Sequence, residues 1–341
     1  MNSDKTITYN NISISLTKEI NKQTKKEEGI FFTPPKTIKE NLNAIKNYFK
    51  NIKSVLEPSC GSCEYIDEIH SLYPNIQITG IENNIKIFEA IKEKTNETIK
   101  LYNSDFLKFN EDKKYDLIIG NPPYFVMKKW EVHSKYYDYF DGRPNIFILF
   151  IIKSLELLND KGIMSFILPK GFINCLYYEK TRVFIKKNYK IINIINCQEN
   201  FNDTQQDTII LIVQKSNPNK SKCKFTFSIN NYTIFGFPYA IKRLNELNKG
   251  SKTLNELGFS VNVGTIVWNQ CKDILSNDKS KTRLIYSSDI TENKLDVKSY
   301  KNEDKKNFID KKGTTLPTLV VNRGYGIMAK YKFNYCLIDV D

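Results

Sequence analysis

The sequence predicts an α/β fold: a doubly wound, mostly parallel sheet with a smaller C-terminal module. Up to about residue 215, short segments rich in Ile, Val and Leu alternate with helical segments. That alternation is typical of parallel strands with helices on both faces. From about residue 252 the alternation is lost, so we expect a second module to begin there.

The expected elements follow one another closely along the chain. After a polar start, residues 37–50 have the apolar spacing of an amphipathic helix. The expected strands are 53–57, 77–82, 100–103, 115–120, 162–168, 190–197 and 207–214, and the expected helices between them are 62–72, 84–94, 145–158 and 178–187. A short connection joins the last two strands, so we expect an antiparallel hairpin at the edge of the sheet.

This pattern divides the chain into four parts. Residues 1–28 are expected to be an N-terminal extension, 29–215 the main α/β domain, and 252–341 the smaller module. Residues 216–251 begin with a stretch of Ser, Asn, Pro and Lys and are expected to be a connecting segment. The apolar stretch 335–340 lies close to the last residue, so we expect the module to be short or truncated.

The composition is that of a soluble globular protein and argues against membrane residence. Of 341 residues, 40% are hydrophobic and 26% are charged. The longest apolar run, Ile146–Ile152, ends at Lys153 and is too short to span a bilayer. The first residues carry no apolar segment of the secretory kind, and the seven cysteines are scattered and odd in number. We therefore expect a cytoplasmic or nucleoid-associated protein that is not secreted.

The net charge of +13 suits a polyanionic partner. Lys and Arg total 51 against 38 Asp and Glu, and binding phosphates with such residues releases counterions. Lys dominates, and Ile and Asn are abundant, which is also typical of an A·T-rich genome. Charge alone does not decide between these interpretations.

The clearest chemical signal is the turn after the strand Tyr115–Gly120, made of Asn121, Pro122, Pro123 and Tyr124. Two consecutive prolines stiffen the backbone and hold its carbonyl groups outward. The Asn side-chain oxygen and the Pro122 carbonyl can then accept hydrogen bonds from one amino group, while the Tyr ring offers a stacking face. An amino group conjugated to a ring is a poor nucleophile, and two fixed acceptors favour its tetrahedral, reactive form. The alternative is a strand-ending turn that merely contains two prolines.

Acidic residues follow three earlier strands. Glu57 begins a loop of small residues, and a carboxylate there suits a ligand with a positive amino group better than it suits a phosphate. Glu82 is placed to bind both hydroxyls of a ribose. Asp105 is placed to accept from an adenine amino group, with Phe106 against the ring. Each acid alone could equally be a helix cap or a turn residue; their positions after successive strands favour a site.

Together these motifs resemble the N6-adenine DNA methyltransferases of the gamma arrangement, as found among type II modification methylases. In that family the cofactor motifs precede the catalytic motif and a recognition domain comes last. Gly29–Pro35 resembles the family's N-terminal motif, Glu57–Cys63 its cofactor loop, and Asn121–Tyr124 its catalytic tetrapeptide. The cofactor-binding residues that the resemblance implies are Phe32, Thr33, Pro34, Glu57, Pro58, Ser59, Gly61, Glu82, Asp105, Phe106 and Asn121.

The resemblance covers about residues 29–215 and implies a Rossmann-like class I methyltransferase. It implies S-adenosyl-L-methionine as cofactor with no metal, double-stranded DNA as partner, and a cognate restriction endonuclease as a further partner. Tyr124 and Phe201 would pack on a flipped target adenine. Cys63 stands where the family usually has Gly. Because no second cysteine pair follows at zinc-site spacing, Cys60 and Cys63 are better interpreted as loop residues than as metal ligands.

Two further regions are candidates for DNA contact. Residues 126–143 are dense in Lys and Tyr and contain Lys128, Lys129 and Trp130; they form either a loop that closes over DNA or a packed aromatic helix. In the C-terminal module, candidates for base or phosphate contact are Arg283, Asn322 and Arg323.

Two other functions remain open at this point. The same turn serves methyltransferases that act on an RNA base or a protein glutamine, and the chain could also be an inactive DNA-binding subunit. The C-terminal module favours DNA over glutamine, and the net charge argues against a protein substrate. The intact tetrapeptide argues against an inactive subunit.

Overall fold

The computed structural model describes residues 8–110, 112–197, 206–218, 223–322 and 333–339. The chain divides into two compact units, residues 1–251 and residues 252–341. We call them unit 1 and unit 2. Two residues predicted from the sequence, Phe201 and Arg323, lie outside the described residues.

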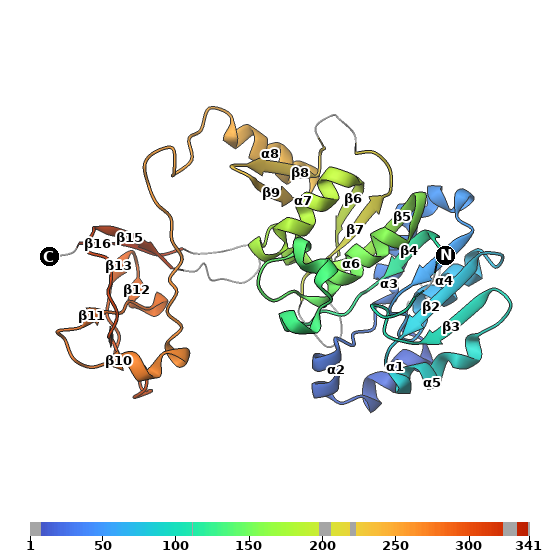
Figure 1. Cartoon of the computed structure of the whole chain (residues 1–341), viewed down its shortest axis with the longest axis horizontal. Coiled ribbons are helices and arrows are strands. Elements are labelled where there is room, and N and C mark those ends of the chain that lie inside the picture. Colours follow the sequence, from blue (N-terminus) through green and yellow to red (C-terminus); the bar gives the residue numbers. More distant parts are fainter. Residues whose placement is uncertain (1–7, 111, 198–205, 219–222, 323–332, 340–341) are drawn as a thin grey trace, which may run out of the picture. The chain divides into compact units, whose positions relative to one another are not determined.

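Unit 1 is built on a seven-stranded sheet of order β3-β2-β1-β4-β5-β7-β6 (Figure 1). The strands are β1 Ser54–Glu57, β2 Gln77–Glu82, β3 Ile99–Asn103, β4 Tyr115–Gly120, β5 Leu158–Pro169, β6 Lys190–Asn196 and β7 Thr208–Gln214. Only β7 runs against its neighbours; it pairs antiparallel with both β5 and β6, and the other strand pairs are parallel. The predicted mostly parallel α/β sheet and its antiparallel edge hairpin are confirmed.

Helices cover both faces of this sheet because side chains along each strand alternate between two cores. In β4, Leu117 and Ile119 lie in one core and Ile118 in the other. The main helices of unit 1 are α1 Asn11–Glu19, α2 Lys22–Glu28, α3 Pro35–Ile45, α4 Glu64–Leu72, α5 Ile85–Ile91, α6 Ile146–Leu157, α7 Glu179–Asn188 and α8 Pro238–Asn248. Residues of α3 and α4 pack in the first core, and residues of α6 and α7 in the second.

The described part of the N-terminal segment is folded onto this domain. Asn10 caps α1 by accepting a hydrogen bond from the Ser13 amide at 2.7 Å. The Ser13 hydroxyl lies 2.7 Å from the Ser62 hydroxyl, and Leu16 and Ile20 pack in one cluster with Ile87. The helix α1 therefore supports the loop after β1, where the sequence predicts only an extension.

Much of the expected connecting segment also belongs to unit 1. Strands β8 Thr226–Ile229 and β9 Tyr232–Phe235 form a hairpin, and α8 follows it. Phe225 and Phe235 are buried in the same core as α6. The segment is folded, unlike the predicted linker, because these aromatic side chains bury apolar surface. The Lys-rich stretch before them accounts for the prediction of a linker.

The described residues of unit 2 form three small sheets. Its strands are β10 Leu275–Ser276, β11 Thr282–Arg283, β12 Ile290–Thr291, β13 Lys294–Leu295, β14 Phe308–Ile309, β15 Thr318–Val321 and β16 Tyr335–Ile338. The fully buried carboxylate of Asp289 organises part of the unit. It accepts hydrogen bonds from the Lys298 amide at 3.1 Å and the Tyr300 hydroxyl at 2.6 Å.

Short 3₁₀ helices connect several of these elements. They are η1 Lys46–Asn51, η2 Lys92–Lys94, η3 Lys129–Glu131, η4 Ser134–Tyr139, η5 Lys170–Ile173, η6 Leu176–Tyr178, η7 Trp268–Gln270, η8 Lys272–Ile274 and η9 Ser287–Asp289. Across the part of the chain that the structure describes, no helix combines the length and apolar character that a membrane crossing requires.

Candidate active site

Most of the predicted site residues meet at one edge of the sheet. Strands β2, β1 and β4 are adjacent and parallel, so their carboxyl ends lie side by side. Glu57 ends β1, Glu82 ends β2, and Asn121 directly follows β4. Open α/β sheets bind their ligands outside this edge.

The side chain of Asn121 is held in one orientation. Its Nδ2 donates to the carbonyl of Phe31 at 3.1 Å. Its Oδ1 accepts from the Tyr124 hydroxyl at 2.6 Å, and the same hydroxyl lies 2.8 Å from the carbonyl of Ile167 in β5. A carbonyl oxygen has two lone pairs, so Oδ1 retains acceptor capacity for an incoming amino group.

Tyr124 is anchored by its hydroxyl and leaves part of its ring accessible. The side chain is half-buried, and its ring meets Phe147 of α6 edge-on at a centroid distance of 6.0 Å. Burial raises the pKa of the Tyr124 hydroxyl well above its ordinary value, so this group remains a donor at neutral pH. The ring is therefore fixed in place and available for stacking.

The N-terminal segment packs directly against the turn. Gly29 adopts a left-handed conformation with φ +68°, and a Cβ placed there would lie 2.8 Å from Pro123 Cβ and 2.9 Å from the Tyr124 amide nitrogen. Only glycine allows both this φ and this approach without strain. The backbone of residues 29–31 thus supports the turn from one side.

The loop after β1 joins the ends of two neighbouring strands. The Ser59 hydroxyl donates to the main-chain carbonyl of Asn121 at 3.1 Å. The Gly61 amide donates to Glu82 Oε2 at 2.9 Å, and the Asn84 amide donates to Glu82 Oε1 at 2.7 Å. The predicted cofactor loop, the predicted ribose-binding acid and the predicted catalytic turn therefore form one hydrogen-bonded assembly.

The two acids at this edge are strongly desolvated. Burial raises the pKa of Glu82 to about 7, although the amides of Asn84 and Gly61 act in the opposite direction. Burial also raises the pKa of Glu57 well above its ordinary value, and the neighbouring Cys63 adds to the effect. Within the described residues, Glu57 Oε2 is buried with no hydrogen-bond partner. An unpaired buried oxygen of this kind is costly unless a ligand supplies a donor.

The remaining residues of the predicted cofactor site differ in position. Thr33 and Pro34 are buried, Phe32 is half-buried, and the Phe32 ring lies 3.6 Å from the position that a Cβ on Gly61 would take. Pro58 is buried beside Glu57. Cys63 adopts φ +67° as the N-cap of α4, a conformation that glycine adopts with less strain.

Asp105 lies in a turn after β3, but Phe106 faces the core. Asp105 Oδ1 accepts from the Leu107 amide at 2.9 Å. Phe106 is 1% exposed and its ring packs on Phe150 at 4.9 Å. Lys153 of α6 donates to the carbonyls of Phe106 at 2.6 Å and Leu107 at 3.1 Å. The position of Phe106 does not support the predicted contact with an adenine ring, because a core side chain has no face open to a ligand.

Sequence reasoning missed two parts of the site. The first is the Tyr124 hydroxyl, which orients Asn121; the sequence predicts a role only for the ring of this tyrosine. The second is Lys153, which breaks an apolar run in the sequence but ties the turn after β3 to α6. A lysine inside an otherwise apolar helix is the signal that could have found it, because a buried ammonium group requires several acceptors.

In unit 2 the predicted contact residues are partly engaged within the fold. Arg283 is exposed, and its guanidinium lies 4.6 Å from the centre of the Phe308 ring. Asn322 is buried, and its Oδ1 accepts from the Asn334 amide at 2.9 Å. Arg283 remains available to a partner, whereas Asn322 has a structural role.

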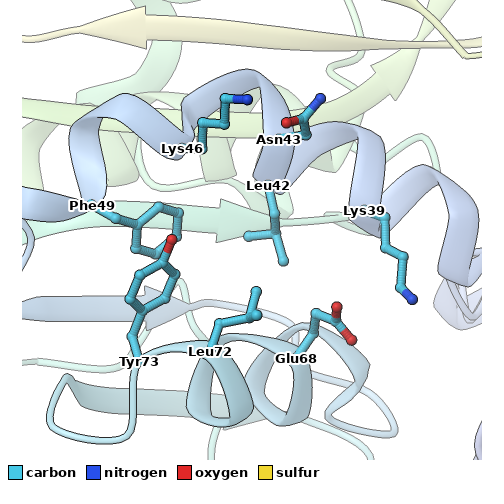
Figure 2. Close-up of a pocket in the computed structure, with 8 residues that line it drawn as sticks. All are labelled: Lys39, Leu42, Asn43, Lys46, Phe49, Glu68, Leu72 and Tyr73. Atoms are coloured by element: carbon cyan, nitrogen blue, oxygen red, sulfur yellow. The ribbon is translucent and has the colours of Figure 1, made fainter.

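A pocket of about 210 Å³ lies elsewhere, between α3, η1 and α4 (Figure 2). Its lining residues are Lys39, Leu42, Asn43, Lys46, Phe49, Glu68, Leu72 and Tyr73. The rings of Phe49 and Tyr73 stack at 4.2 Å. These two residues precede β1 and β2, so this end of the pocket lies towards the amino ends of the strands. Ligand sites of such sheets lie at the carboxyl ends, and we assign the pocket no function.

The fold of unit 1 is that of the class I S-adenosylmethionine-dependent methyltransferases. A solved structure from Listeria monocytogenes, described as a protein of this class, superposes with a TM-score of 0.50 at 19% identity, covering 62% of this chain and 69% of that chain. The sequence matches the Eco57I restriction-modification methylase family over residues 5–202. The chain belongs to this family.

Curated relatives extend the similarity beyond the family region. Modification methylase CviBIII of Paramecium bursaria Chlorella virus NC1A is 28% identical over 341 residues, covering 98% of this chain and 84% of the relative. Type II methyltransferase M.CvrRI of Paramecium bursaria Chlorella virus XZ-6E is 28% identical over 254 residues, covering 74% of this chain and 65% of the relative. The chain thus spans most of the first relative and less than two thirds of the second.

The carboxyl edge of the sheet fits S-adenosylmethionine. Its ammonium group matches the unpaired buried oxygen of Glu57, and a Cβ on Gly120 would lie 3.4 Å from Glu57 Cγ. A Cβ at this position would therefore be in van der Waals contact with Glu57. Among the described residues, no cluster of three or more His, Cys, Asp or Glu side chains is arranged to hold a metal ion.

Proposed function

We propose that the protein transfers a methyl group from S-adenosylmethionine to the N6 amino group of adenine in double-stranded DNA. The observation that carries the proposal is the fixed carboxamide of Asn121, whose nitrogen donates to the carbonyl of Phe31 and whose oxygen accepts from the Tyr124 hydroxyl. Membership of a restriction-modification methylase family supports DNA as the substrate. The net charge of +13 is consistent with it.

Asn121 and Pro122 hold the amino group that reacts. Asn121 Oδ1 and the Pro122 carbonyl accept one N6 hydrogen each, which draws the nitrogen lone pair out of conjugation with the ring. S-adenosylmethionine supplies an electrophilic methyl group on a sulfonium. The N6 proton becomes acidic once nitrogen carries a methyl group, so no general base is required. Of the two histidines, His70 is on α4 and His133 caps η4.

Residues around the ends of β1, β2 and β3 bind the cofactor in this proposal. Glu57 pairs with the ammonium group, Glu82 accepts from the ribose hydroxyls, and Asp105 accepts from the adenine amino group. The other contacts come from the segment before α3 and the loop after β1, namely Phe32, Thr33, Pro34, Pro58, Ser59 and Gly61.

The target adenine leaves the DNA stack to reach Asn121. Extruding a base costs a few kcal/mol, and stacking on an aromatic ring offsets about 1–3 kcal/mol per base. Tyr124 provides one such ring. Phe201 remains the proposed second ring, and it lies outside the described residues. A cognate restriction endonuclease is part of the same proposal, because the family name pairs modification with restriction.

A parallel transfer assay tests the substrate class. The purified chain is incubated with methyl-labelled S-adenosylmethionine and, separately, with duplex DNA, with RNA and with a protein lysate. We expect label in DNA. Label only in RNA or only in protein would move the same chemistry to an RNA base or a glutamine. Cofactor binding without transfer to any of the three would identify an inactive subunit.

A further inference from the structure

The loop after β5 exposes two large apolar side chains beside the candidate active site. It comprises residues 170–178, with η5 and η6, and we call it the β5 loop. Leu176 is 67% exposed and Tyr177 is 65% exposed. Apolar side chains that stay exposed gain no stabilisation from burial, and adjacent ones can mark a surface that binds a partner.

A buried arginine holds the β5 loop in shape. Arg182 is fully buried, and its Nη1 donates to the carbonyls of Phe172 at 2.9 Å and Cys175 at 2.8 Å. The Tyr232 hydroxyl donates to the carbonyl of Asn174 in the same loop. The backbone is therefore anchored immediately before Leu176, and the exposed pair is presented on a rigid support.

The β5 loop lies next to the catalytic turn. Strands β4 and β5 are parallel neighbours, so the turn after β4 and the loop after β5 emerge at the same edge. The Tyr124 hydroxyl contacts the carbonyl of Ile167 near the end of β5. The ring of Phe147 lies 6.0 Å from that of Tyr124 and 5.0 Å from that of Tyr178. Tyr178 follows Tyr177 directly in the chain. The exposed pair therefore lies only one or two residues along the chain from a side chain that packs beside the catalytic turn.

The neighbouring segment supplies positive charge. Thr181 at the start of α7 donates to the carbonyl of Tyr139 at 2.7 Å, which ties α7 to residues 126–143. That segment exposes Trp130 and places the Lys128 ammonium 5.3 Å from the centre of its ring. Exposed cations beside apolar side chains complement a polyanion whose bases have been unstacked.

We propose that Leu176 and Tyr177 form a wedge that enters the DNA stack where the target adenine has left it. Apolar side chains that enter base stacks are a common device of proteins that distort DNA. This inference rests on the proposed function and adds residues that contact DNA but not the reacting atoms. The wedge stabilises the extruded state, so its contribution is greatest when the target adenine is paired.

A rescue experiment tests the wedge. The double variant Leu176→Ala/Tyr177→Ala is compared with the wild type on two duplexes that contain the sequence methylated by the wild type in plasmid DNA. In one duplex the target adenine faces thymine; in the other it faces an abasic position. We expect methyl transfer by the double variant to fall about 10- to 100-fold on the paired duplex and to match the wild type on the abasic duplex. An unpaired adenine leaves the stack at little cost, so the wedge is then dispensable.

A matched control and two contrary outcomes complete the test. Tyr239→Ala removes a 76% exposed aromatic from α8 in the same unit, and we expect it to leave transfer unchanged on both duplexes. Equal losses on the paired and abasic duplexes, or no loss on either, would overturn the wedge while leaving the proposed function intact. Absence of transfer from the wild type to any duplex DNA would contradict the proposed function and the wedge with it.

Discussion

The hydroxyl of Tyr124 lies 2.6 Å from the side-chain oxygen of Asn121 and 2.8 Å from the carbonyl of Ile167. One hydroxyl hydrogen is thus shared between the catalytic turn and the end of β5. The tyrosine therefore has two separable tasks: its ring offers a stacking face, and its hydroxyl fixes the carboxamide that holds the substrate amino group.

Tyr124→Phe separates these two tasks. Removing the hydroxyl frees the carboxamide of Asn121 while the ring remains, so we expect the single-turnover rate of methyl transfer to fall about 5- to 10-fold, as for the loss of one hydrogen bond. DNA affinity should change little. Tyr137→Phe is the control, because its hydroxyl donates to the carbonyl of Lys129 at 3.2 Å, outside the turn. A Tyr124→Phe variant with unchanged rate would show that the hydroxyl does not position Asn121.

Gly29→Ala tests whether the N-terminal segment supports the turn. The new methyl group would meet Pro123 Cβ at 2.8 Å and the Tyr124 amide nitrogen at 2.9 Å, so we expect the rate of transfer to fall at least as sharply as in Tyr124→Phe. Gly142→Ala is a matched control: Gly142 has φ +67° with nothing within 4 Å of an added Cβ. Both substitutions cost about 1–2 kcal/mol of backbone strain, measured by urea denaturation. Equal rates of transfer in the two variants would show that the N-terminal segment does not support the catalytic turn.

Glu82 predicts a pH dependence of cofactor binding. Its pKa is raised to about 7 by burial, and the ionised carboxylate is the better acceptor for ribose hydroxyls. We expect the affinity for S-adenosylmethionine, measured by calorimetry, to rise with pH through 7 and then to level off. Glu82→Gln should weaken binding and reduce this dependence. A wild type whose affinity is flat between pH 6 and 8 would contradict the assignment.

The same raised pKa has the opposite consequence for the folded state without cofactor. Between the ordinary value of 4.5 and about 7, the folded protein holds a proton on Glu82 that the unfolded chain has released. The free energy of unfolding should therefore fall as pH rises through this window. Urea denaturation at pH 5 and pH 7.5 measures the change, which should be smaller in Glu82→Gln.

Cys63 carries the strain of a left-handed backbone at φ +67°. In Cys63→Gly, relief of about 1 kcal/mol of strain offsets the loss of a small buried side chain, so we expect a change in unfolding free energy below about 1 kcal/mol. Cys63→Val should destabilise more, because β-branched residues tolerate this conformation poorly. Denaturant melts of both variants decide the point; a glycine variant less stable than the valine variant would contradict it.

The sheet could be predicted from local pattern alone, because its strands are short apolar runs bounded by turn residues. Strands 77–82 and 115–120 are observed with the predicted bounds. The edge with Glu57, Glu82 and Asn121 followed directly, because parallel strands end on the same side. Strand β5 begins at Leu158, earlier than predicted, because its first residues pair across an irregularity opposite β4.

Other features depend on contacts between distant residues and could not be predicted. The role of helix α1 emerges from the bond between Ser13 and Ser62 and from the packing of Leu16 against Ile87. The hydroxyl of Tyr124 contacts the carbonyl of Ile167, which lies in a different strand, β5. Phe106 follows Asp105, a predicted cofactor-binding residue, but its ring packs on Phe150 in the core and its carbonyl accepts from Lys153.

The most direct test of the central claim is nucleoside analysis of duplex DNA treated with the wild-type protein and with Asn121→Ala. The DNA is incubated with methyl-labelled S-adenosylmethionine, digested, and its nucleosides separated by chromatography. We predict label in N6-methyl-2′-deoxyadenosine from DNA treated with the wild type, and no label from Asn121→Ala. The melting temperature of Asn121→Ala should match that of the wild type. Label on any other base, or near-normal transfer by Asn121→Ala, would contradict the assignment of this turn as the site of adenine methylation.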